Sequence, residues 1–154
     1  MACKNHQKCF KEAVKAAELI CKKKHLKFTK DRKAIFELIW GSHEPVKAYD
    51  LLKSLDKNSL HPPLVYRALN FLLENKFIHK IDSINSYFGC SHPDSNHDCY
   101  FLICSKCYNV AEACEDNLEK EVMLVAKKKG FFVENISLEI TGVCKSCLRS
   151  LPSS

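Results

Sequence analysis

Apolar side chains recur at helical spacing at the start of the chain. One face of residues 10–24 is apolar and consists of Ala13, Ala16, Ala17 and Ile20. This spacing is typical of an amphipathic helix. Thr29 has the character of an N-cap for a second helix, which Gly41 ends. The apolar positions of that second helix are Ile35, Leu38 and Ile39.

Two further helices are predicted after Gly41. Pro45 opens a short helix that runs to Leu55, and two prolines open a longer helix that continues through residues 64–74. Proline suits the first turn of a helix, because its missing N–H has no intrahelical partner there. Four apolar residues of the longer helix share one face: Val65, Leu69, Leu72 and Leu73. The opposite face carries Arg67, Asn70 and Glu74. Short helices joined in this way are typical of a helix-turn-helix.

Two short apolar segments follow, at residues 77–81 and 86–90, with the turn-like sequence Asp82-Ser83-Ile84-Asn85 between them. We interpret them as a β-hairpin. Helices followed by a hairpin make a winged helix. The polar stretch from Ser91 onward lacks periodicity and contains a proline, which favours a hinge.

The second half of the chain has a different pattern. A strand is predicted at residues 100–103, with a hairpin partner at 109–113. A helix follows that contains Leu118, Val122 and Val125 and ends at Lys127-Lys128-Lys129-Gly130. Residues 131–133 and 136–140 are predicted as strand, and residues 148–154 as a short disordered tail. The expected fold class is therefore α+β.

Composition agrees with a folded protein of one or two small domains. The chain has 154 residues, of which 46% are hydrophobic and 27% charged, and a formal net charge of +6. A positive net charge favours an acidic partner such as nucleic acid. No apolar run is long enough for a membrane span, and the N-terminus shows no secretory signal. We therefore expect a cytoplasmic protein whose ten cysteines serve metal binding, not disulfides.

Cations cluster near the end of the first predicted helix. They are Lys22, Lys23, Lys24, Lys30 and Arg32, among others. Such a run is compatible with a solvated helix face. It is equally compatible with phosphate contact, because clustered cations displace counterions from a nucleic-acid backbone.

Two Cys-x-x-Cys pairs are the strongest chemical signal. They are Cys104 with Cys107, and Cys144 with Cys147. Two intervening residues let both sulfurs converge on one metal, and two such pairs complete a tetrahedral four-sulfur zinc site. More residues separate the pairs than the usual spacing of about 15 to 20. A folded unit must therefore bring them together. The alternative is that these cysteines are small buried side chains or form disulfides.

The chain resembles the ferric uptake regulator family of metal-dependent transcription factors, and within it the zinc-sensing branch. The resemblance extends from about Ala17 to Cys147. It rests on the shared order and spacing of residues 26–32 (LKFTKDR), 48–52 (AYDLL), 62–69 (PPLVYRAL), 77–80 (FIHK), 85–87 (NSY), 101–107 (FLICSKC) and 142–147 (GVCKSC).

The resemblance implies a winged-helix DNA-binding domain (residues 1–90), a hinge (residues 91–97) and a small α/β dimerisation domain (residues 98–154). It implies a structural zinc on the two cysteine pairs. It also implies a regulatory zinc, about two zinc ions per monomer in all, on ligands from both domains: His79, Cys90, His97 and Glu112. Two imidazoles, one thiolate and one carboxylate can fill a tetrahedral zinc shell, and the thiolate favours zinc over harder ions. Cys99 and Cys114 are interpreted as buried thiols, with additional metal ligands as the alternative.

We therefore expect a zinc-responsive repressor, not an enzyme, that binds a palindromic operator in double-stranded DNA as a homodimer and controls zinc homeostasis. No membrane or small-molecule substrate is expected. The candidate DNA contacts, besides the cation cluster, are Tyr49, Tyr66 and Arg67. Arg67 is the candidate for base contact, because arginine pairs bidentately with guanine. The two tyrosines are candidates for contact with bases or phosphates. The nearest alternative is a regulator of the same fold that senses iron, manganese or peroxide. More distant alternatives are a zinc-dependent hydrolase and a zinc-storage protein.

Overall fold

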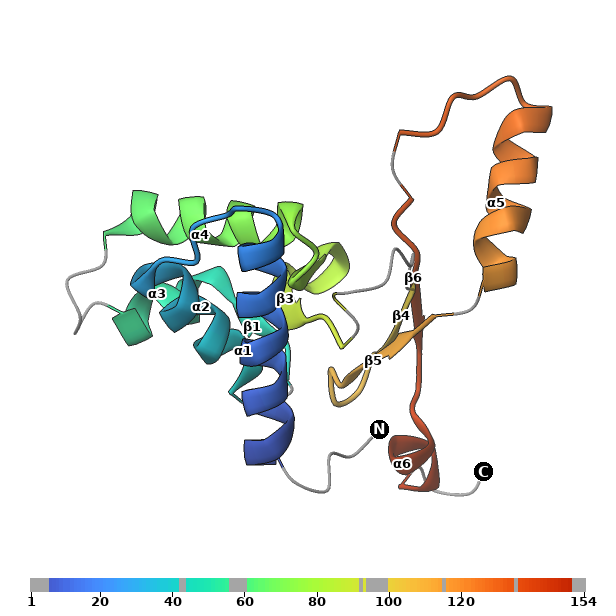
Figure 1. The fold of residues 1–154 in the computed structure, drawn as a ribbon. Coiled ribbons are helices and arrows are strands. Elements are labelled where there is room, and N and C mark those ends of the chain that lie inside the picture. Colours follow the sequence, from blue (N-terminus) through green and yellow to red (C-terminus); the bar gives the residue numbers. More distant parts are fainter. Residues whose placement is uncertain are drawn as a thin grey trace. The chain divides into compact units, whose positions relative to one another are not determined.

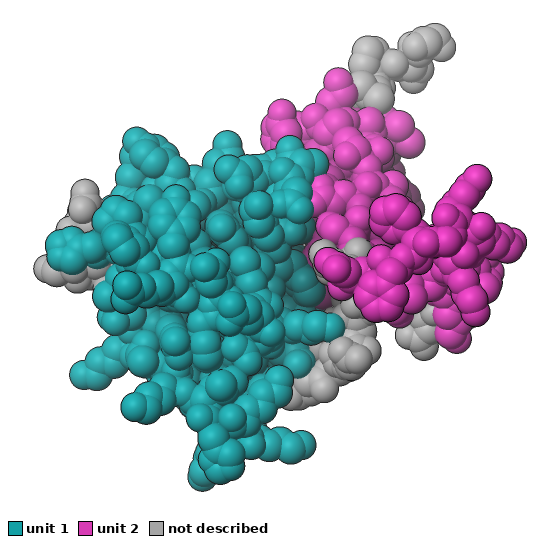
Figure 2. Space-filling view, turned by 90° about the horizontal axis from the view of Figure 1, so that it is seen from above, with its two compact units in different colours: residues 1–95 teal, residues 96–154 magenta. Residues whose placement is uncertain are grey.

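The computed structural model describes residues 6–41, 44–55, 61–91, 93, 100–114, 116–134 and 136–150. The chain divides into two compact units, Met1–Ser95 and Asn96–Ser154 (Figure 2). Each unit contains one three-stranded sheet. No helix in the described ranges combines the length and the apolar character needed to cross a lipid bilayer.

Four helices build most of the first unit (Figure 1). They are α1 (His6–Lys23), α2 (Lys30–Trp40), α3 (Ala48–Leu55) and α4 (Pro62–Glu74). Thr29 is the N-cap of α2, and its side chain accepts a hydrogen bond from the backbone N–H of Arg32, as expected from the sequence. The two prolines occupy the first turn of α4. The four predicted helices are therefore present, and α1 begins four residues earlier than the pattern indicated.

A three-stranded antiparallel sheet completes the first unit. Its strands are β1 (Val46–Lys47), β2 (Ile78–Ile81) and β3 (Ser86–Gly89), in the order β1-β3-β2. The predicted hairpin is confirmed, and its turn contains the short 3-10 helix η2 (Asp82–Ile84). The prediction that Pro45 opens a helix was wrong. The next two residues pair with β3 before α3 starts, because Val46 lies opposite Tyr87 in the sheet.

The core of the first unit lies between α1, α2, α4 and the sheet. Phe36 and Phe77 meet edge to face, with ring centroids 6.2 Å apart. The guanidinium of Arg32 lies 3.6 Å from the centroid of the Phe71 ring on α4, and it also donates to the carbonyl of Lys27. Arg32 thus fastens the α1–α2 connection to α4, a structural task that the sequence did not indicate.

Trp40 packs directly on the backbone of Gly89. A Cβ atom added to Gly89 would lie 2.5 Å from the indole ring. This distance is too short for a real Cβ contact, so any other residue at the end of β3 would require the indole to move. The following residue is Cys90, which is 1% exposed and whose N–H donates to the carbonyl of Phe77. The indole therefore helps to define the conformation of this strand end.

We predict that Gly89→Ala destabilises the first unit by about 1–3 kcal/mol, because the indole must move to admit the methyl group. Urea unfolding followed by circular dichroism measures the effect. Gly142→Ala is the matched control, since an added Cβ at that position meets no atom within 4 Å. If Gly89→Ala were as stable as Gly142→Ala, the indole of Trp40 would move aside without a loss of stability.

The second unit is built on a mixed sheet. Its strands are β4 (Tyr100–Cys104), β5 (Val110–Ala113) and β6 (Glu139–Gly142), in the order β5-β4-β6. The helix α5 (Asp116–Lys128) lies between β5 and β6 in the chain, and α6 (Lys145–Arg149) follows β6. β4 and β6 are parallel, with Cys104 opposite Gly142. Parallel neighbours require a long crossover, which the segment containing α5 provides.

Two predictions for the second unit need correction. Residues 131–133 and 136–138 are not strand, and β6 begins only at Glu139. Phe131 and Phe132 are 74% and 87% exposed. Leu138 does lie beside β4, because its carbonyl accepts a hydrogen bond from the N–H of Phe101 at 3.0 Å, and the regular pairing with β4 starts at Glu139. The expectation of a disordered tail was wrong for Leu148 and Arg149, which belong to α6, and residues 151–154 lie outside the described residues. The predicted hinge lies largely outside the described residues.

Candidate metal centre and DNA-reading surface

The first cysteine pair occupies the turn between β4 and β5. Cys104 is the last residue of β4, and the N–H of Tyr108 donates to its carbonyl at 2.9 Å. The N–H of Cys104 in turn donates to the carbonyl of Asn109 at 3.0 Å. Tyr108 adopts a left-handed conformation with φ of 58°. This residue therefore closes the turn that carries Cys104 and Cys107.

The second pair lies at the start of α6. Cys144 is the N-cap of this helix, and Cys147 lies within it. The N–H of Ser105 donates to the carbonyl of Gly142 at 2.7 Å, so the two cysteine loops are joined by a backbone hydrogen bond. The parallel pairing of β4 and β6 therefore delivers the second pair beside the first.

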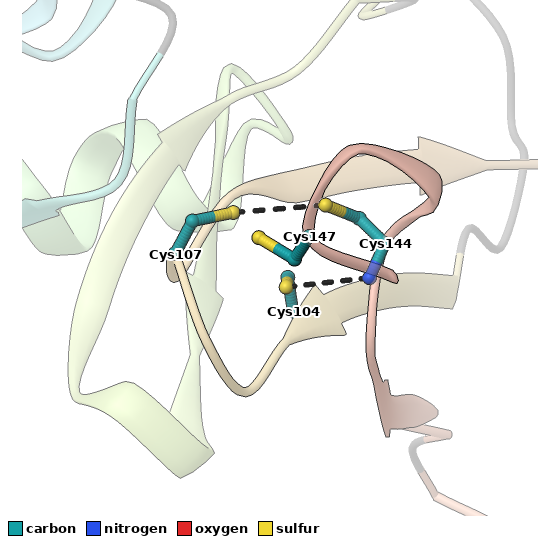
Figure 3. A group of neighbouring side chains, drawn as sticks. All are labelled: Cys104, Cys107, Cys144 and Cys147. Atoms are coloured by element: carbon teal, nitrogen blue, oxygen red, sulfur yellow. Dashed lines mark hydrogen bonds between the residues drawn. The ribbon is translucent and has the colours of Figure 1, made fainter. Parts of the chain in front are cut away.

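All four sulfur atoms converge on one point (Figure 3). They lie within 4.8 Å of one another, and the sulfurs of Cys107 and Cys144 are 3.8 Å apart. A tetrahedral zinc ion with Zn–S bonds of about 2.3 Å requires sulfur atoms about 3.8 Å apart. The geometry therefore fits a four-sulfur zinc centre.

The local hydrogen bonds shift the thiol pKa values in both directions, down for Cys104 and Cys144 and up for Cys147. The N–H of Cys144 donates to the Cys104 sulfur at 3.3 Å. Together with the N–H groups of Cys107 and Lys106, it lowers the pKa of the Cys104 thiol to about 6. Hydrogen bonds to the sulfurs of Cys144 and Cys107 raise the pKa of Cys147 to about 12. Four such sulfurs cannot all be thiolates without a cation among them, and a zinc ion supplies that positive charge.

We predict that Tyr108→Gly is more stable than Tyr108→Ala by about 1 kcal/mol, because only glycine adopts the left-handed conformation without a Cβ clash. The tyrosine side chain is exposed, so both variants lose the same small contact area. Thermal unfolding of the zinc-loaded proteins measures the difference. A result in which alanine is as stable as glycine would mean that the turn does not require this backbone conformation.

Two of the four predicted regulatory ligands lie together in the first unit. His79 stands on β2 and Cys90 follows β3, and their ligand atoms are within 4.8 Å of each other. The antiparallel register explains this, because His79 lies opposite Phe88 and the strand end at Cys90 returns beside Phe77. Glu112 is half-buried on β5 of the second unit, and His97 lies outside the described residues.

The predicted DNA-contacting residues are accessible. One side of α4 is buried and includes Val65, Ala68 and Leu69. Tyr66 and Arg67 are exposed on the other side. Tyr49 is exposed at the start of α3. The four candidate lysines are exposed near the end of α1 and the start of α2: Lys22, Lys23, Lys24 and Lys30. Arg32 differs from them, because its guanidinium is engaged with Phe71.

The prediction that Cys114 is a buried thiol was wrong. It is exposed and disulfide-bonded, so the expectation that the cysteines serve metal in place of disulfides also fails at this position. Cys99 lies outside the described residues. Lys47 is a candidate site residue that sequence reasoning missed. It precedes the exposed Tyr49 by two positions, but only the strand β1 reveals where it lies.

Comparison with known proteins gives consistent results. The model of the Ferric uptake regulator family matches residues 23–141. The Zinc uptake regulation protein of Escherichia coli K12 is 36% identical over 140 residues, which cover 89% of this chain and 82% of that protein.

Among solved structures, a zinc uptake regulator complexed with zinc and DNA matches with a TM-score of 0.86 and 35% identity, covering 92% of this chain and 96% of its own. Holo XcZur matches with a TM-score of 0.83 and 36% identity, covering 88% and 96%.

Proposed function

The chain belongs to the ferric uptake regulator family, and from this premise we propose that it is a zinc-responsive transcriptional repressor. It binds palindromic operator DNA as a zinc-loaded homodimer and controls genes of zinc uptake. The observation that carries this proposal is its likeness, over 92% of its length, to a zinc uptake regulator that was solved with zinc and DNA. As a DNA-binding regulator it would act in the cytoplasm.

The four-cysteine centre is proposed as the structural zinc site. The second unit has a thin core, and its buried apolar residues within the described ranges are four: Phe101, Ile103, Cys104 and Val110. So small a core rarely stabilises a domain alone, and a structural metal is one usual remedy. The ligands come from the turn after β4 and from α6, so a bound zinc would join the two ends of the unit.

A regulatory zinc is proposed on His79, Cys90, His97 and Glu112, which gives about two zinc ions per monomer. The proximity of His79 to the thiol of Cys90 supports this set, and the thiolate favours zinc over iron or manganese. His79 and Cys90 belong to the first unit and Glu112 to the second. Zinc held by all four would act as a switch by stabilising the DNA-competent arrangement over the others.

The homodimer is proposed to form through the second unit. Its apolar side chains remain exposed along α5 and the segment after it: Met123, Leu124, Val125, Phe131 and Phe132. A hollow of about 630 Å³ lies between α5 and residues 131–133. Exposed apolar patches of this kind mark protein interfaces, and a second copy would cover this one. Each copy would then present one α4 to one half-site.

Arg67 is proposed to read a base edge, and Tyr49 and Tyr66 to contact bases or phosphates. The four exposed lysines at the α1–α2 connection, with Arg32, would supply salt-dependent affinity. A metal-dependent hydrolase would need a zinc position open to water, whereas four cysteines fill the coordination shell of the centre in the second unit. Regulation by iron, manganese or peroxide remains the competing proposal.

The test is the zinc content per monomer before and after mild chelation, with DNA binding assayed on each sample. The DNA is a duplex that the zinc-loaded protein has selected from a random pool. We expect about two zinc ions to fall to about one, with DNA binding lost and then restored by zinc but not by iron or manganese. One zinc ion throughout, with unchanged DNA binding, would leave the structural site and reject the zinc switch.

A further inference from the structure

A hollow of about 310 Å³ opens on the first unit, next to the exposed side of α4. The start of α3, the first turns of α4 and the turn before β3 surround it. Its lining includes Lys47, Tyr49, Leu52, Tyr66, Ile84 and Asn85. The two tyrosines are strongly exposed, at 64% for Tyr49 and 48% for Tyr66.

The backbone explains why these residues meet. β1 pairs with β3 so that Lys47 lies opposite Ser86, the residue after Asn85. Asn85 adopts a left-handed conformation with φ of 46° at the end of η2, which asparagine tolerates better than most residues. Burial of Val65 and Leu69 leaves Tyr66 on the accessible side of α4.

The chemistry of the lining favours an anion. The lysine ammonium, the two phenol groups and the asparagine amide can all donate hydrogen bonds. None of the described residues that line the hollow carries a carboxylate, and Lys47 is the charged one among them. Asp50, the acidic residue of the first turn of α3, does not belong to the lining. The ammonium of Lys53 adds positive charge, since it lies 4.4 Å from the centroid of the Tyr49 ring.

The position of the hollow identifies the anion. Tyr66 contributes to the lining, and the next residue on α4 is Arg67, the proposed base reader. A DNA backbone that runs along this helix presents one phosphate after another, and phosphate contacts fix the register in which a protein lies on DNA. The start of α3 also lies here, and backbone N–H groups at the start of a helix attract anions.

We propose that the hollow formed by Lys47, Tyr49, Tyr66 and Asn85 holds a single backbone phosphate of the operator and thereby positions Arg67 in the major groove. This inference rests on the proposed function. It adds a phosphate site whose residues come from β1, the start of α3, the turn before β3, and α4. Because a phosphate contact carries no direct sequence information, Lys47 should set affinity and leave base selectivity unchanged.

The first test is the salt dependence of operator binding by Lys47→Met. Each neutralised phosphate contributes a slope of about 0.9 to the dependence of log affinity on log salt concentration. We expect the slope to fall by about that amount for each monomer's half-site. The ratio of the parent's operator affinity to that of Lys47→Met should then fall about threefold per half-site when the salt concentration rises from about 50 to about 200 mM. Lys128→Met, which removes the same charge from the second unit, should keep the parental slope.

The second test locates the phosphate. Each phosphate of one half-site is replaced in turn by a neutral methylphosphonate. One substitution should weaken binding by the parent and by Lys128→Met, but should have a much smaller effect on Lys47→Met. Tyr49→Phe should show reduced sensitivity at the same position, because its hydroxyl is assigned to the same phosphate.

The outcomes separate this inference from the proposed function. An unchanged salt slope in Lys47→Met, or equal sensitivity of parent and variant at every methylphosphonate, would overturn the phosphate site while zinc-dependent DNA binding still stood. A change of base preference in Lys47→Met would also overturn it, because it would make the lysine a base reader. Failure of the zinc-loaded parent to bind any selected duplex would overturn both proposals.

Discussion

Cys104→Ser should lose the structural zinc, destabilise the second unit and break the dimer together. The four sulfurs are close enough to share one tetrahedral ion, and a serine hydroxyl is a poor replacement for a thiolate. Structural zinc sites contribute on the order of 10 kcal/mol to folding, which is comparable to the whole stability of a small domain, about 5–15 kcal/mol. The few buried apolar residues of this unit cannot compensate for such a loss.

Zinc content by elemental analysis, sedimentation and circular dichroism measure these three effects. The zinc content should fall by at least about one ion per monomer, and the helices of the first unit should remain. Ser105→Ala is the control, because it alters the next residue of the same turn without touching a sulfur. A Cys104→Ser dimer of parental stability that retains two zinc ions would exclude Cys104 as a ligand.

His79→Ala should retain the dimer and the structural zinc but lose the zinc response of operator binding. His79 and Cys90 face each other across the end of the hairpin, and the remaining proposed ligands belong to the second unit or lie outside the described residues. Typical coupling between two sites changes affinity about 5- to 150-fold. We expect a loss in this range when zinc-loaded and chelated samples are compared by mobility shift.

Two further variants distinguish a ligand from a structural residue. Cys90→Ser preserves the size of a side chain that is almost fully buried, and it should abolish the same response. His25→Asn removes an exposed histidine that has a left-handed φ of 53°, and it should respond to zinc like the parent. If His79→Ala also responded like the parent, this histidine would not belong to the regulatory site.

The helices could be predicted from the sequence because their signals are local. The Thr29 cap, the prolines of α4 and the apolar stripe through Val65 and Leu69 each act within a few residues. β1 could not be predicted in this way, because its two residues are a strand only through pairing with Tyr87 and Ser86.

The cysteine site was predictable in its ligands but not in its assembly. The two Cys-x-x-Cys pairs identify the ligands, whereas their convergence depends on the parallel register of β4 and β6. Phe131 and Phe132 lie outside that pairing and remain exposed, although their composition favoured a strand. The regulatory ligands depended on the family resemblance, since no local pattern relates His79 to Glu112.

The contact between Trp40 and Gly89 has a practical consequence. Trp40 is the single tryptophan of the chain, and its indole packs on the residue that precedes Cys90. Excitation at the red edge of the absorption band selects this indole over the five tyrosines. Its emission should therefore change when a metal binds to His79 and Cys90, so the unlabelled protein carries its own optical reporter for the sensing step, separate from the four-cysteine centre.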